Sequence, residues 1–172
     1  MSPSDAATAA VDVTPARVLV AGVGYTNLAD HSAGLHAIDR LGRIGDHVDV
    51  EDFSYGAIDV LFTLQRRPPY RKAVFIAAVE RGDPVGSVRW QRWERPAISA
   101  AELQEKVAEA VTGVVSLDNL LHITAHFGGL PEDVVVVEIE PGEERYGPAP
   151  GPVVDAAITE ALRLARHEAG IA

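Results

Sequence analysis

The stretch "VAGVGYTNLADHSAG", Val20 to Gly34, joins a hydrophobic run to a glycine-containing turn and then to an amphipathic segment. A β-branched run that ends in glycine predicts a buried strand followed by a turn. Downstream, Leu35, Ile38 and Leu41 are three residues apart, which predicts a helix with one apolar stripe. The stretch therefore predicts a strand, a turn and a helix, with the turn at the carboxyl end of the strand.

Hydrophobic runs and amphipathic segments alternate along the rest of the chain, which predicts an α/β fold. We expect a three-layer sandwich: a mostly parallel sheet of about five strands, with helices on both faces. The segment Val88 to Trp93 alternates polar and apolar residues and suits an antiparallel or edge strand. The expected strands are 17–24, 47–52, 72–79, 86–93 and 133–141, and the expected helices are 33–43, 57–67, 99–111, 116–127 and 153–168.

Composition limits the possible functions. The chain has 172 residues, a net charge of −10 and no cysteine, which excludes disulfides, thiolate zinc sites and cysteine nucleophiles. Because the negative charge repels phosphates, we expect no nucleic-acid partner. No apolar run suits a bilayer span, so we expect no membrane insertion and a cytoplasmic protein. We expect residues 1–16 to be a flexible leader and residues 17–172 to form a single domain.

The Gly22-Val23-Gly24 turn raises the possibility of a nucleotide site. A dinucleotide-binding turn needs a third glycine three residues later, where this chain has Asn27. The helix cannot start well before about Ser32, which moves its amides away from the turn. Nucleotide binding on an α/β fold stays an alternative function.

Taken with its spacing, "GVGYTNLADHSAG" resembles the first active-site loop of the hydrogenase maturation endopeptidases. That family removes a C-terminal peptide from the large subunit of nickel–iron hydrogenases. Three further segments are similar to the family and follow in the same order, so the resemblance covers about residues 17 to 168. They are "EDFSYGAIDVLF" after the second strand, "FIAAVERGDPVGSV" at the third strand, and "VVVVEIEPGEERYGPAPGPVVDAA" near the end.

The resemblance also implies a metal site, thought to hold the nickel that the substrate carries. The family's three ligand positions fall on His31, Asp52 and Gly113, so an acid is replaced by histidine and a histidine by glycine. Asp30 is a candidate third oxygen ligand beside His31 and Asp52. The family's asparagine after the glycine turn is Tyr25, and its strand-three aspartate is Ala77.

Two functional hypotheses follow from these matches and departures. The first is a divergent, hydrogenase maturation protease-like protein that acts on or binds a large-subunit precursor, with impaired or lost peptidase activity. The alternative is an active metal-dependent C-terminal processing endopeptidase that uses Asp52 and His31, with nickel from the substrate or zinc. Because two of the three expected ligand positions are substituted, enzymatic activity is left open.

Two other pairs of side chains could carry chemistry. His122 and His126 are four residues apart on an expected helix and could share a metal, although a half-exposed helix face explains them better. Glu51 and Asp52 could couple as an acid pair, but neighbours in a strand point to opposite faces. Trp90 and Trp93 should likewise lie on opposite sides of their strand.

Overall fold

The structure, a computed structural model, describes residues 17–171. Its centre is a five-stranded sheet in the order β2-β1-β3-β5-β4. Only β4 runs antiparallel to its neighbour; the other pairs are parallel. The mostly parallel sheet predicted from the sequence is therefore confirmed. The strands are β1 (Val18–Val23), β2 (Val48–Phe53), β3 (Lys72–Ala78), β4 (Val88–Arg92) and β5 (Asp133–Ile139).

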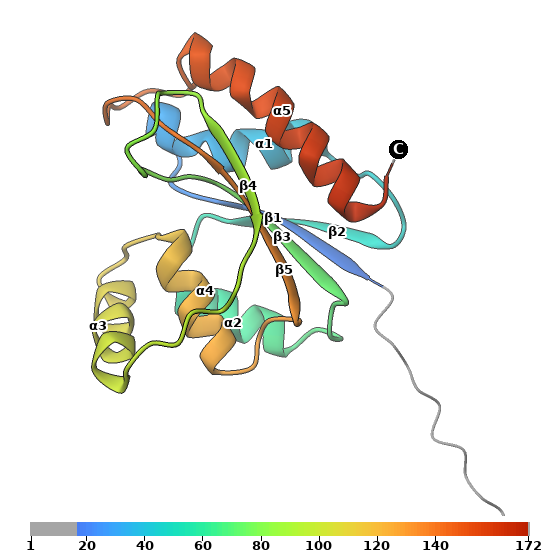
Figure 1. The fold of residues 1–172 in the computed structure, drawn as a ribbon, viewed down its shortest axis with the longest axis vertical. Coiled ribbons are helices and arrows are strands. Elements are labelled where there is room, and N and C mark those ends of the chain that lie inside the picture. The colour runs from blue at the N-terminus through green and yellow to red at the C-terminus, as the bar shows by residue number, and fades with distance from the viewer. Residues whose placement is uncertain (1–16, 172) are drawn as a thin grey trace, which may run out of the picture.

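Helices cover both faces of this sheet, as expected for parallel strands joined by crossovers (Figure 1). One face is covered by α1 and α5, and the other by α2, α3 and α4. The predicted three-layer sandwich is thus confirmed. The helices are α1 (Ala33–Leu41), α2 (Ala57–Gln65), α3 (Ala100–Val111), α4 (Leu117–His126) and α5 (Pro152–Ala169), and a short 3₁₀ turn, η1 (Ala29–Ser32), precedes α1.

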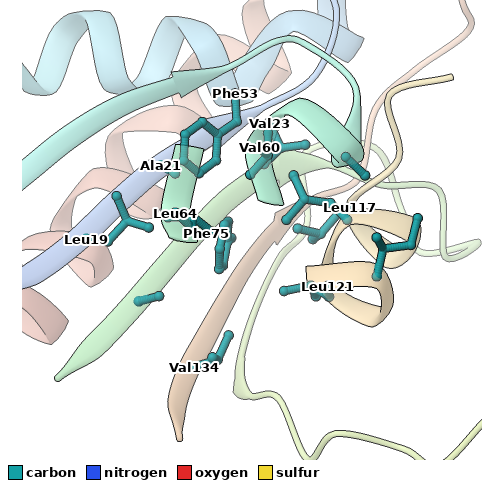
Figure 2. Packing of buried hydrophobic residues seen from close by; sticks show 14 of the residues in the cluster. Leu19, Ala21, Val23, Phe53, Val60, Leu64, Phe75, Leu117, Leu121 and Val134 are labelled. Carbon is teal, nitrogen blue, oxygen red and sulfur yellow. The ribbon is translucent and has the colours of Figure 1, made fainter. Parts of the chain in front are cut away.

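Two apolar layers lie on either side of the sheet. Side chains of β1 alternate between them, with Leu19 and Ala21 facing α2 and α4 (Figure 2) and Val18 and Val20 facing α1 and α5. Every residue of β1 is buried because the strand is central and covered on both faces. This explains why its sequence is a continuous hydrophobic run.

The edge strand β4 carries the first of the two tryptophans, and the second follows it directly. The Trp90 indole donates a hydrogen bond to Glu168 of α5, at 3.1 Å. Trp93 packs on the other layer, edge-to-face with His122 of α4 at 5.5 Å between ring centroids. The two rings therefore lie on opposite sides of the sheet, as their spacing predicted.

Helix ends follow the sequence signals. Ser99 and Glu102 form a reciprocal capping box at the start of α3, and the Ser116 hydroxyl caps α4. Helix α1 begins at Ala33, one residue after the predicted earliest start. The predicted leader, residues 1–16, lies outside the described residues. No helix within residues 17–171 is long and apolar enough to cross a membrane.

Glycines let α1 approach the sheet more closely than any other residue would allow. A Cβ atom on Gly34 would lie 2.4 Å from the Ile76 carbonyl oxygen and 2.5 Å from that of Val23. A Cβ atom on Gly22 would lie 2.3 Å from the Gly34 carbonyl oxygen. Backbone therefore packs on backbone at the middle of the fold, and the glycines of the opening stretch serve this contact.

We predict that Gly34→Ala lowers the free energy of unfolding by about 3 kcal/mol, because its methyl group would clash with backbone that cannot move independently. Urea denaturation followed by circular dichroism measures the change. Gly56→Ala is the control, since its Cβ would have no neighbour closer than 3.6 Å. A loss for Gly34→Ala no larger than the loss for the control would contradict the packing role.

Candidate functional site

The candidate site lies at the carboxyl edge of the parallel strands, where ligands of such sheets usually bind. Three connections meet there: residues 24–32 after β1, residues 79–87 after β3 and residues 140–151 after β5. Backbone bonds join the first to the third, since Ala29 N–H donates to Gly147 and Gly147 N–H to Asn27. The opening stretch of the sequence therefore forms one wall of this edge.

Asp30 is buried and holds the first and third connections together. Its carboxylate accepts the backbone N–H of Gly142 at 3.0 Å and that of Gly151 at 2.6 Å. Gly151 precedes the first turn of α5, where a negative charge is favoured by the helix dipole. Both carboxylate oxygens of Asp30 thus accept backbone hydrogen bonds. The whole residue is only 7% exposed.

His31 points toward the connection after β3 instead. Its Nε2 lies 3.1 Å from a carboxylate oxygen of Glu80, which is itself largely exposed. Its Nδ1 is buried and has no hydrogen-bond partner. The imidazole therefore has a carboxylate partner at Nε2 and no hydrogen-bond partner at Nδ1.

Asp52 lies at the end of β2 and stabilises its own turn. Its carboxylate accepts the Ser54 N–H at 2.8 Å, a local contact that places Ser54 before α2. The neighbouring Glu51 bonds Arg67 at 2.5 Å instead, so the two acids do not act as a pair. Alternation along the strand sends them to different partners, as the sequence predicted.

The three predicted ligands do not fit a metal site as they lie. Each oxygen of Asp30 accepts a backbone amide, one oxygen of Asp52 accepts the amide of its own turn, and only His31 faces another charged group. Within residues 17–171, no three His, Cys, Asp or Glu side chains are grouped to hold a metal ion. The ligand role of these residues stays a prediction from the resemblance.

Arg81, directly after β3, is the most highly connected charged residue at this edge. Its guanidinium donates two hydrogen bonds to Asp118 at the start of α4, at 3.0 and 2.9 Å. It also bonds Glu138 of β5 at 2.6 and 3.2 Å. The backbone N–H groups of Arg81 and Gly82 donate to Glu140 at 2.8 and 3.1 Å. One residue thus ties three elements together.

These contacts shift the pKa values of Arg81 and Asp118. The hydrogen bonds to Asp118 and Glu138 raise the pKa of the Arg81 guanidinium above its ordinary value. The same contact with Arg81 lowers the pKa of Asp118, against the opposing effect of its burial. The guanidinium therefore stays charged, and Asp118 is held ionised.

The sequence assigned Arg81 no role. Nothing in the chain order identifies the carboxylates that Arg81 contacts. Asp118 is 37 residues away and Glu138 is 57 residues away along the chain. Only the pairing of β3 with β5 and the position of α4 bring them together.

The substituted positions of the resemblance lie on different elements. Ala77 is paired in register with Val23 on one side and with Glu138, the partner of Arg81, on the other. Gly113 lies between α3 and α4 with a φ of +92°, which a histidine would adopt only with strain. Two residues later, Val115 N–H donates to the Tyr25 hydroxyl at 2.8 Å, so Tyr25 holds that connection against the first one.

The His122 and His126 pair is engaged elsewhere. His122 contacts Trp93, and the His126 ring lies edge-to-face with Phe127, 4.8 Å between ring centroids. Burial lowers the pKa of His122, and the nearby Lys106 adds to this effect. Both imidazoles therefore contribute to packing on the outer side of α4.

Comparison with solved structures identifies the class of fold. A crystal structure of a hydrogenase 2 maturation peptidase from Thaumarchaeota archaeon SCGC_AB-539-E09 is 25% identical, covers 91% of this chain and 99% of its own, and has a TM-score of 0.62. The hydrogenase maturating endopeptidase HybD from E. coli is 21% identical, with coverages of 90% and 94% and a TM-score of 0.65. No protein-family model matches the chain, and no curated protein matches it.

A third match extends the comparison. The NiFe hydrogenase maturation protease HybD from Thermococcus kodakarensis is 21% identical, covers 89% of this chain and 99% of its own, and has a TM-score of 0.62. The chain therefore has the fold of the hydrogenase maturation proteases over about nine-tenths of its length. The resemblance predicted from the sequence motifs is confirmed.

We predict that Asp30→Asn lowers the free energy of unfolding by about 2 kcal/mol, because it weakens two charge-assisted hydrogen bonds in a buried place. Chemical denaturation at neutral pH measures the loss. Asp39→Asn, on the exposed side of α1, is the matched control and should change stability by less than about 0.5 kcal/mol. Equal losses for the two variants would show that Asp30 does not hold the connections together.

We predict that Asp118→Asn lowers the free energy of unfolding by about 1 kcal/mol at neutral pH, through the loss of its ion pair with Arg81. Since folding lowers the pKa of Asp118, its stabilising contribution is complete above its ordinary pKa of 3.8 and is lost as the pH falls through the folded-state value. The difference in the free energy of unfolding between wild type and Asp118→Asn should therefore disappear in acid.

Denaturation curves from neutral pH down into acid, at constant ionic strength, test this pH dependence. Glu105→Gln removes an exposed charge of α3 that forms no ion pair with Arg81, and it serves as the control. If the difference in the free energy of unfolding between wild type and Asp118→Asn stays constant into acid, Asp118 stabilises the fold by some means other than its charge.

Proposed function

We propose that this protein binds a hydrogenase large-subunit precursor, or a related polypeptide, without cleaving it. Support begins with the fold, which matches maturation proteases that differ from this chain at about three-quarters or more of aligned positions. Fold alone does not fix function, so the activity has to be argued from the site.

Arg81 is the observation that carries the proposal. Its guanidinium lies between the ends of β3 and β5 and the start of α4, where Asp118 and Glu138 neutralise it. Glu138 is buried, so its charge is already matched inside the protein. A metal ion approaching Asp118 or Glu138 would meet the positive charge of Arg81, and these two carboxylates would have to leave Arg81 to bind the metal.

The remaining positions support the same conclusion. Asp30 and Asp52 are engaged with backbone amides, and Ala77 offers no ligand atom in its side chain. Gly113 likewise has no ligand atom, and its positive φ disfavours a histidine. A hydrolytic metal site needs enough ligands to fix geometry while leaving a position open for water or substrate.

The alternative, an active endopeptidase, is favoured by a single feature. His31 Nε2 faces Glu80 and its Nδ1 lacks a partner, so this imidazole is not fully committed to packing. A catalytic role for His31 would predict release of a peptide that depends on this residue. The two functions therefore make opposite predictions for one experiment.

The test incubates the purified protein with the precursor of a large subunit from the same organism, with and without nickel. We expect the two chains to co-elute in size-exclusion chromatography and mass spectrometry to detect no released C-terminal peptide. His31→Ala should bind the precursor as well as wild type does. An active maturation peptidase with its own precursor is the positive control for cleavage.

Two results would overturn the proposal. Peptide release by the wild type that is lost in His31→Ala would establish the endopeptidase instead. Failure of the wild type to form any complex, when the control peptidase processes its precursor under the same conditions, would remove the binding role.

A further inference from the structure

The outer edge of β2 is open for pairing with another strand. The carbonyl of His47 accepts the N–H of Val18, which sets the register with β1. In a parallel strand, alternate residues direct both backbone groups to the same edge. Val50 and Asp52 therefore direct their N–H and C=O groups away from β1, and no other segment within residues 17–171 supplies a backbone partner there.

A groove runs beside this edge. It has a volume of about 550 Å³ and lies between β2 and α1. Its lining is mostly polar, with Ile38 and Val48 largely buried beneath it, and Gly42 and Gly45 mark the end near the start of β2. An extended chain adding to β2 would direct alternate side chains toward α1, on the side that carries Asp39.

The groove is continuous with the candidate site. A second hollow of about 270 Å³ shares Leu35, Asp39 and Asp52 with it. That hollow reaches Thr26 and Asn27 of the connection after β1. A segment lying along β2 would therefore deliver one end to the carboxyl edge of the sheet.

The charge of the groove indicates what it would bind. Its lining holds more carboxylates than guanidinium groups, and its arginines are already paired, Arg17 with Asp49 and Arg43 with Asp46. Among the described residues, Asp39 and Asp52 form no ion pair. Since the whole chain also carries a net charge of −10, a basic segment is electrostatically complementary.

We infer that the outer edge of β2 is a docking site for an extended polypeptide segment that carries lysine or arginine. The segment adds to the sheet as a sixth strand through the outward backbone groups of Val50 and Asp52. Its basic side chains face Asp39 and the neighbouring carboxylates. This deepens the proposed function, because it specifies how a polypeptide partner is held, and it rests on that function only for the partner's identity.

The test uses a short peptide of alternating valine and lysine, with alternating valine and glutamate as the matched peptide. We expect the basic peptide to shift the amide resonances of Val50 and Asp52 in an NMR titration and to slow their hydrogen exchange. Binding should weaken as salt is added, since the attraction is between exposed charges. The acidic peptide should leave the same amides unchanged.

Two variants distinguish the contribution of charge to peptide binding from the contribution of strand pairing. Asp39→Lys should weaken binding of the basic peptide about tenfold, and Glu105→Lys on α3 should leave it unchanged. Val50→Pro should abolish binding by removing an outward N–H. Circular dichroism confirms that each variant folds, and if Val50→Pro does not, the NMR mapping on wild type decides the strand pairing.

The inference is overturned if the basic peptide shifts no resonance of β2, or if the two peptides bind equally well. It is also overturned if sedimentation shows a dimer and the free dimer already protects the amides of Val50 and Asp52 from exchange. The precursor experiment keeps the two proposals distinct. If the precursor binds Asp39→Lys as tightly as wild type, the β2 site is wrong and the binding function stands. If no precursor binds, the binding function fails and the peptide titration still decides the site.

Discussion

Helix α1 rests directly on the backbone of β1 and β3, and the rest of the carboxyl edge depends on that contact. It requires glycine at 22 and 34, because a Cβ atom at either would come closer than 2.5 Å to a carbonyl oxygen. The close approach leaves only a short 3₁₀ turn before the helix. That turn buries Asp30 under the connection before α5 and turns His31 toward Glu80. A backbone contact thus sets the positions of the charged side chains.

The carboxyl edge built on this contact is held mainly by internal pairing of charges. Asp30 is satisfied by amides, and Arg81 by Asp118 and Glu138. Buried charges are tolerated only when such partners are present, and removing one partner costs more than the pair contributes. An edge of this kind suits a protein that holds a partner in a fixed geometry. Asp30, Asp118 and Glu138 already have partners here, whereas Asp52 accepts only the N–H of Ser54.

The sequence predicted the fold well because the signals for it are local. Continuous β-branched runs identified the buried strands, the alternation in Val88–Trp93 identified the antiparallel edge strand, and Ser99 with Glu102 marked the start of α3. The candidate site was predicted less completely. The turn after the first strand was placed at the carboxyl end of that strand, but Arg81 received no role. Its carboxylate partners come from distant elements, and no spacing in the chain reveals them.

The sequence by itself determined the order of strands and helices, the glycines at the first turn, and the missing ligand atoms at Ala77 and Gly113. Those are properties of residue type and short-range pattern. The tertiary structure alone decided that Asp30 clasps two connections, that Asp52 turns to its own loop, and that Arg81 lies between α4 and β5. The physical reason is that hydrogen bonds and ion pairs act over a few ångströms in space, and packing brings together residues far apart in the chain.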